Sequence, residues 1–205
     1  MAKILSFDNK LMKIGNGLLG PAEVTPPGPV LPANTVRVRT NDGNPPTKGS
    51  YTSYDTATLV SGTTDVYDVY KSGTNFESLL DGCTNIIEIL GANTTGVTNM
   101  TYMLYGCAWL TTITLFDTSS VTNMEGMFTN CEALTAIPLF DTSSVINMDN
   151  TFSGCYRVES GALALYNQAS SQTTPPSNHS YTFRNCGSNT VTGAAELAQI
   201  PDDWK

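Results

Sequence analysis

The sequence contains few charged residues, only 14% of 205, against about 25% in an average soluble protein. Acidic residues outnumber basic ones by 18 to 10, and no basic cluster exceeds the pair Arg37 and Arg39. A nucleic-acid-binding protein needs a basic stripe that neutralises phosphates. The composition therefore excludes nucleic acid as a partner and predicts a neutral, polar exterior.

Long hydrophobic runs are also missing. No apolar run reaches the roughly 20 residues of a membrane-spanning helix, and residues 1–10 contain no apolar stretch of signal-peptide length. We therefore expect neither membrane insertion nor secretion by the general route. Display outside a cell would then need another vehicle, and a phage particle is one.

Groups suited to catalysis or metal binding are scarce. The single histidine, His179, is expected to be a partly buried structural residue, and the cysteines lack the close spacing of a metal site. The G-x-G-x-x-G letters at 15–20 lack the strand and helix context of a nucleotide site. Asp117 and Asp141 stand at identical positions of a repeated turn rather than forming a carboxylate pair. We predict no enzymatic activity, no cofactor and no metal.

A repeat of 24 residues organises the chain instead. Four cysteines follow one another at intervals of 24 and a fifth after 31, which implies a seven-residue insertion in the last unit; they are Cys83, Cys107, Cys131, Cys155 and Cys186. An asparagine stands eight residues before each cysteine. A single unit cannot bury its own apolar residues, whereas stacked units can.

The apolar spacing within each unit predicts a short helix followed by a short strand. Met124, Met127, Phe128 and Cys131 follow the i, i+3, i+4, i+7 spacing of a helix face. Asn123, immediately before them, is predicted to cap this helix. The L-x-x-L-x-L spacing at 134–139 is typical of a leucine-rich-repeat strand. Packed helices would hold equivalent cysteines about 8–10 Å apart, too far for disulfides, so we expect free, buried thiols.

Residues 121–131 (VTNMEGMFTNC) and 140–148 (FDTSSVINM) resemble the BspA-like leucine-rich repeats. These repeats also occur in mycoplasma surface lipoproteins and in gut-phage or prophage proteins, and the resemblance covers roughly residues 73–190. It implies surface display, adhesion or partner binding, with no catalytic residues. Residues 4–19 and 193–201 look like versions encoded by phages of gut bacteria, so a gut-phage or prophage-encoded form is expected.

The predicted fold is an α/β repeat solenoid, leucine-rich-repeat-like, of 24-residue helix-strand-turn units, with a small β-rich N-terminal segment. We expect four parts: a leader or anchor with a Pro-rich linker at 1–33, a β-rich N-terminal cap at 34–72, repeats at 73–190 and a C-terminal cap at 191–205. Strands are predicted at 35–40 and 65–70, and helices at 159–169 and 192–200. The leader either seats the chain in a larger assembly or folds against the repeats.

Three aromatic residues of the second unit lie outside its apolar stripe and form the candidate binding site. Tyr102, Tyr105 and Trp109 replace residues that are mostly small or polar in the other units. Aromatic side chains supply much of the energy at interfaces and can stack on sugar rings. The alternative is that this patch packs on residues 34–72 or on a neighbouring subunit.

These patterns predict a non-enzymatic phage virion surface protein, of fibre or decoration type, that binds a host surface protein or glycan. Its other partners would be virion proteins, contacted through the N-terminal segment, and a homo-oligomer is possible. A bacterial cell-surface adhesin of the BspA-like type is the alternative, with a bacterial cell surface as its location.

Overall fold

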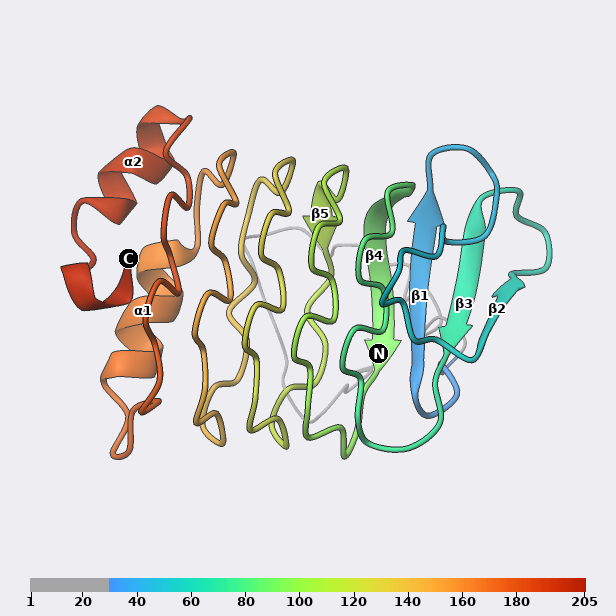
Figure 1. The fold of residues 1–205 in the computed structure, drawn as a ribbon, viewed down its shortest axis with the longest axis horizontal. Coiled ribbons are helices and arrows are strands. Elements are labelled where there is room, and N and C mark those ends of the chain that lie inside the picture. Colours follow the sequence, from blue (N-terminus) through green and yellow to red (C-terminus); the bar gives the residue numbers. More distant parts are fainter. Residues whose placement is uncertain (1–29) are drawn as a thin grey trace, which may run out of the picture. The chain divides into compact units, whose positions relative to one another are not determined.

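A mixed five-stranded sheet and two short α-helices form the regular structure of residues 30–205, the part of the chain that the computed structural model describes (Figure 1). Its order is β2-β3-β1-β4-β5. The strands are β1 Thr35–Thr40, β2 Thr56–Leu59, β3 Val66–Tyr70, β4 Ile86–Asn93 and β5 Thr112–Ile113. The helices are α1 Ala162–Ser170, α2 Val191–Leu197 and the 3-10 helix η1 Asp202–Trp204. The predicted leader, most of the Pro-rich linker and the glycines at 15–20 lie outside the described residues.

Alternation of apolar and charged residues explains β1, which confirms the predicted strand. Val36 and Val38 are buried in the core, whereas Arg37 and Arg39 point to the other face. The Arg37 Nε lies 2.6 Å from Oδ1 of Asp68 on β3, and Arg39 pairs with Glu88 on β4. These cross-strand pairs hold β1 antiparallel between β3 and β4.

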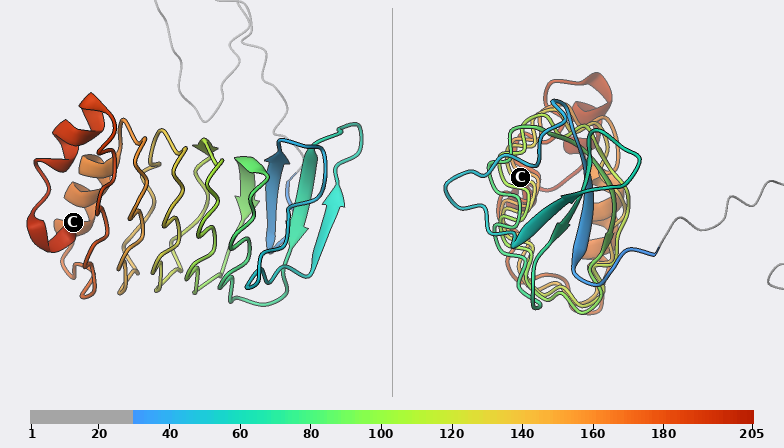
Figure 2. Two further views of the ribbon diagram at one scale, coloured as in Figure 1. Left: turned by 45° about the horizontal axis from the view of Figure 1, so that its top comes forward. Right: turned by 90° about the vertical axis from the view of Figure 1, so that its right-hand side faces the viewer.

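From β4 onward, the chain winds into coils that stack on one another. Parallel bridges join Asn75 to Asn99, Asn99 to Asn123, and Asn123 to Asn147, so residues 24 apart lie side by side. Figure 2 shows that these coils overlie one another when they are viewed along the stack. Equivalent residues of successive units therefore form a column along the stack. Neighbours within a column are about 4.8 Å apart, the usual spacing of hydrogen-bonded strands.

Two consecutive four-residue turns occupy the segment for which a helix was predicted. In the unit of Cys131, the N–H groups of Met127 and Cys131 each donate to the carbonyl oxygen three residues earlier at 3.1 Å. The third residues of these turns, Gly126 and Asn130, have φ of 58° and 60°. Type II turns require this left-handed conformation at their third residue. A right-handed helix cannot pass through two such residues.

The other N–H groups of the two turns bind the following coil. Four alternate N–H groups donate at 2.8 Å to carbonyls 23 residues further on: Met124 to Asn147, Gly126 to Asp149, Phe128 to Thr151 and Asn130 to Ser153. In a helix beginning after Asn123, the N–H groups of Phe128 and Asn130 would have bonded within the helix instead. The backbone instead stabilises the contact between units.

The predicted α/β solenoid of helix-strand-turn units is therefore wrong, as is the helix-capping role of Asn123. The Asn123 Oδ1 accepts a hydrogen bond from Glu125 N at 2.9 Å and so closes a local turn. The strand predicted in each unit is also largely absent from the described residues. It is represented by the two-residue strand β5 and by one isolated bridge between Ala136 and Ser160. Leu139, assigned to the predicted strand's apolar face, is 54% exposed.

The free, buried state of all five cysteines is confirmed. The thiols of Cys107, Cys131 and Cys155 each donate to a carbonyl oxygen of the preceding coil, at 3.1–3.3 Å. Burial raises the pKa of the Cys83 and Cys155 thiols to about 12 from an ordinary value of 9.0. The cysteines thus act as small apolar residues, and three of them add one weak hydrogen bond.

This burial predicts that alkaline pH destabilises the protein. The Cys83 and Cys155 thiols ionise near pH 9 in the unfolded chain and near pH 12 in the folded one. Their contribution to the stability of the folded state is therefore complete below pH 9 and is lost as the pH rises toward 12. The free energy of unfolding should fall by up to about 1.4 kcal/mol per pH unit for each ionising thiol. Urea denaturation between pH 8 and 10.5 measures it, and a flat profile would contradict thiol burial.

The C-terminal residues cover the last coil. The predicted helices at 159–169 and 192–200 are confirmed as α1 and α2, and the side chain of Thr190 caps α2 by accepting from Gly193 N. The carbonyl oxygen of Trp204 in η1 accepts from Phe183 N at 2.8 Å. The Trp204 ring is buried, which closes the core at this end.

Candidate binding surface

Stacking of the coils brings side chains from distant positions in the sequence into one surface. Trp109, Ala133 and Arg157 are equivalent residues of three successive units, and Ala108, Glu132 and Tyr156 precede them in the chain. Ala133 N donates to the carbonyl oxygen of Ala108 at 3.2 Å, which fixes these coils side by side. The column of Trp109, Ala133 and Arg157 therefore lies beside the column of the residues that precede them.

The structure separates the three aromatic residues predicted as the site. The rings of Tyr102 and Tyr105 meet edge to face, with centroids 5.7 Å apart. The Tyr102 hydroxyl donates to Oε1 of Glu125 at 2.9 Å, and this hydrogen bond is the main cause of a raised Tyr102 pKa. Tyr102 is half-buried and adopts the left-handed φ of 53°. Among the described residues, neither tyrosine ring packs against the Trp109 ring.

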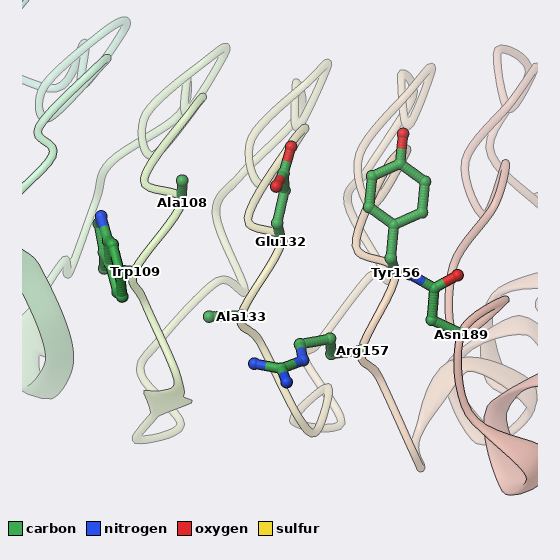
Figure 3. Close-up of a pocket in the computed structure, with 7 residues that line it drawn as sticks. All are labelled: Ala108, Trp109, Glu132, Ala133, Tyr156, Arg157 and Asn189. Carbon is green, nitrogen blue, oxygen red and sulfur yellow. The ribbon is translucent and has the colours of Figure 1, made fainter.

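Trp109 instead borders a pocket of about 410 Å³, here called the Trp109 pocket (Figure 3). Its lining residues are Ala108, Trp109, Glu132, Ala133, Tyr156, Arg157 and Asn189. The Trp109 side chain is 61% exposed, so residues 34–72 do not bury it. The small Ala108 and Ala133 beside it leave room around the ring.

The polar groups of the pocket are available to a ligand. Glu132, Arg157 and Asn189 are exposed, and Tyr156 is half-buried. Within residues 30–205, neither Glu132 nor Arg157 belongs to an ion pair. Figure 3 shows the Arg157 guanidinium reaching toward Ala133, in the row that contains Trp109.

Sequence reasoning missed four of these residues: Glu132, Tyr156, Arg157 and Asn189. The 24-residue period already aligned Arg157 with Trp109, and that alignment was the available signal. Equivalent residues of neighbouring coils share a surface, so the period places their side chains side by side. Alignment on Cys186 places Ser188, rather than Asn189, at the position equivalent to Trp109, so the period did not select Asn189.

The remaining chemical candidates have structural roles. The Asp117 carboxylate accepts hydrogen bonds from the N–H and hydroxyl of Ser119 at 3.0 and 2.7 Å, which lower its pKa. His179 stacks on Trp204 with ring centroids 4.4 Å apart and contacts the Pro176 carbonyl through Nδ1. Over residues 30–205, no cluster of three metal-ligating side chains occurs, and no helix is long and apolar enough to cross a membrane.

Comparison with known proteins relates most of the chain to a protein family. Residues 62–190 match the model of the family described as Mycoplasma protein of unknown function, DUF285. This match is compatible with a BspA-like surface protein. Neither the curated proteins nor the solved structures contain a match.

Proposed function

Since the chain belongs to the DUF285 family through residues 62–190, we propose that it is a non-enzymatic surface protein that binds an external partner through the Trp109 pocket. One observation carries this proposal: a tryptophan that is 61% exposed lies beside a glutamate and an arginine that form no ion pair within residues 30–205. Tryptophan and arginine are the residues most enriched among energetic hot spots of interfaces.

The composition of the pocket favours binding over catalysis. Glu132 is its single carboxylate, whereas most glycoside hydrolases need two that flank the bond to be broken. The pocket also lacks a histidine or cysteine to act as base or nucleophile. Its groups suit recognition by stacking, hydrogen bonding and charge.

Display on the exterior of a cell or a virion is part of the proposal. The DUF285 match favours a bacterial cell surface of the BspA-like type, and the likeness of residues 4–19 and 193–201 to phage-encoded versions favours a virion. Mass spectrometry of purified phage particles and of peptides shaved from intact cells separates the two. Finding the chain only in the cytosolic fraction would contradict surface display.

Replacing Trp109 by alanine should abolish most partner binding without unfolding the protein. The ring is largely exposed, so its loss removes little buried area, and the melting temperature should stay within about 2 °C. Loss of a hot-spot tryptophan should weaken binding to intestinal epithelial cells or mucin by about 2 kcal/mol or more. Flow cytometry of labelled protein and thermal denaturation measure the two effects.

Tyr51→Ala provides the matched control because Tyr51 is 75% exposed and lies outside the pocket lining. It should change neither binding nor stability. A Trp109→Ala variant that loses stability but still binds would assign Trp109 to packing and leave the pocket without a function.

A further inference from the structure

We propose that the ligand of the Trp109 pocket is a neutral oligosaccharide that lies across the coils, an inference that rests on the binding function proposed above. Among the described residues, this pocket combines an exposed aromatic face, charged groups outside any ion pair and a defined volume. Its volume of about 410 Å³ suits a ligand larger than an ion or a single water cluster.

The exposed indole ring of Trp109 is suited to stacking on a sugar ring. The face of an indole ring carries partial negative charge, which complements the weakly positive C–H groups on one side of a pyranose ring. Stacking of this kind needs an exposed ring with small neighbours. Trp109 has both, because Ala108 and Ala133 are the nearest lining residues in its own coil and the next one.

The polar side chains that line the pocket match the hydroxyl groups of a sugar. The Glu132 carboxylate accepts hydrogen bonds, the Arg157 guanidinium donates them, and the Asn189 amide and Tyr156 hydroxyl do both. Each sugar hydroxyl is a donor and an acceptor, so vicinal hydroxyls match a mixed set of this kind. One negative and one positive side chain nearly cancel, which leaves no preference for a charged sugar.

Backbone hydrogen bonds between the coils disfavour a peptide strand as the ligand. A peptide that adds a strand needs free N–H and C=O groups at a sheet edge. In the pocket, Ala133 N already binds the Ala108 carbonyl and Asn189 N binds the Tyr156 carbonyl at 3.0 Å. These two N–H groups are therefore not free to pair with a peptide strand, which favours recognition through side chains.

The spacing of the coils sets the size of the ligand. Trp109, Glu132, Arg157 and Asn189 come from four successive coils, which span about 14 Å at about 4.8 Å per coil. One pyranose ring cannot contact all four. A short oligosaccharide can, with one ring stacked on Trp109 and later rings beside Arg157 and Asn189. The chain's net charge of −8 further disfavours anionic polysaccharides.

Tryptophan fluorescence offers a direct test because the chain has only two tryptophans and Trp204 is buried. The probes are neutral hexasaccharides of glucose, mannose, galactose and N-acetylglucosamine, with sialyllactose and a heparin hexasaccharide as acidic comparators. We expect at least one neutral probe to shift the emission and to bind at least tenfold more tightly than either acidic probe. Because Trp109→Ala removes the reporting ring, its affinity is measured by isothermal titration calorimetry, and it should be about 30-fold weaker or more. Arg157→Ala should weaken it less, and Tyr51→Ala should leave it unchanged.

A parallel experiment separates failure of this inference from failure of the proposed function. Epithelial cells are treated with periodate, which cleaves the vicinal diols of glycans, or with protease. Loss of Trp109-dependent binding after periodate supports the oligosaccharide. Binding that survives periodate and is lost after protease overturns it while the surface-binding function stands. Tighter binding of an acidic probe overturns the neutral assignment. Cell binding that does not depend on Trp109 overturns both proposals.

Discussion

Replacing Phe128 by alanine should lower the free energy of unfolding by about 3–5 kcal/mol, the usual cost of truncating a buried phenylalanine. The Phe128 ring is fully buried between coils. Its centroid lies 5.1 Å from that of Phe152 at an interplanar angle of 8°, and 5.7 Å from that of Phe140. Backbone hydrogen bonds of 2.8 Å between successive coils, such as that from Phe128 N to the Thr151 carbonyl, hold the neighbouring backbones in place. The backbones therefore cannot move in to fill the cavity. Urea denaturation measures the loss.

Two further variants serve as controls for the Phe128→Ala measurement. Phe128→Leu keeps most of the apolar volume and should cost clearly less than the alanine variant. Leu115→Ala removes a side chain that is 56% exposed and should change stability by less than about 0.5 kcal/mol. Equal losses for Phe128→Ala and Leu115→Ala would show that the stacked rings are not the core.

The Trp204→Ala variant should lose a similar amount, about 3–5 kcal/mol, by opening the C-terminal end of the stack. Trp204 stacks on His179 and meets Tyr166 edge to face, with centroids 5.3 Å apart. Its loss also exposes Phe183, the last ring of the buried column. Denaturation gives the energy, and limited proteolysis should cleave first within residues 191–205.

Conservative replacement tests whether the ring or its indole N–H matters. Trp204→Phe keeps an aromatic ring against His179 and should recover more than half of the lost stability. Trp109→Ala removes the same side chain from an exposed position and should leave the unfolding curve nearly unchanged. If Trp204→Ala unfolded like the wild type, the C-terminal segment would not act as a cap.

The helix prediction failed because two backbone conformations share one apolar pattern. Residues at i, i+3, i+4 and i+7 line one side of a helix, and they are also the first and fourth residues of two consecutive four-residue turns. The prediction that these residues face the core is correct, because all four are fully buried in the unit of Met124, Met127, Phe128 and Cys131. The glycine or asparagine at the third position of most of these turns was the available signal against a helix, since such residues favour φ > 0.

The candidate site was predicted only in part for a related reason. Trp109 stood out because other units carry smaller or polar residues at its position, and it lines the pocket. Tyr102 was chosen by the same logic, yet its hydroxyl is bound to Glu125 and its ring rests against Tyr105. Their different surroundings depend on contacts between coils, which a comparison of units within the sequence does not contain.

The sequence by itself determined the 24-residue period, the buried cysteines, strands β1 and β3 and helices α1 and α2, because each follows from local spacing of apolar residues. Only the tertiary structure decided between helix and tandem turns, since that choice depends on where alternate N–H groups find acceptors. Those acceptors lie 23 residues away in the next coil. The same stacking placed Arg157 and Asn189 beside Trp109, so the pocket exists only once the coils are assembled.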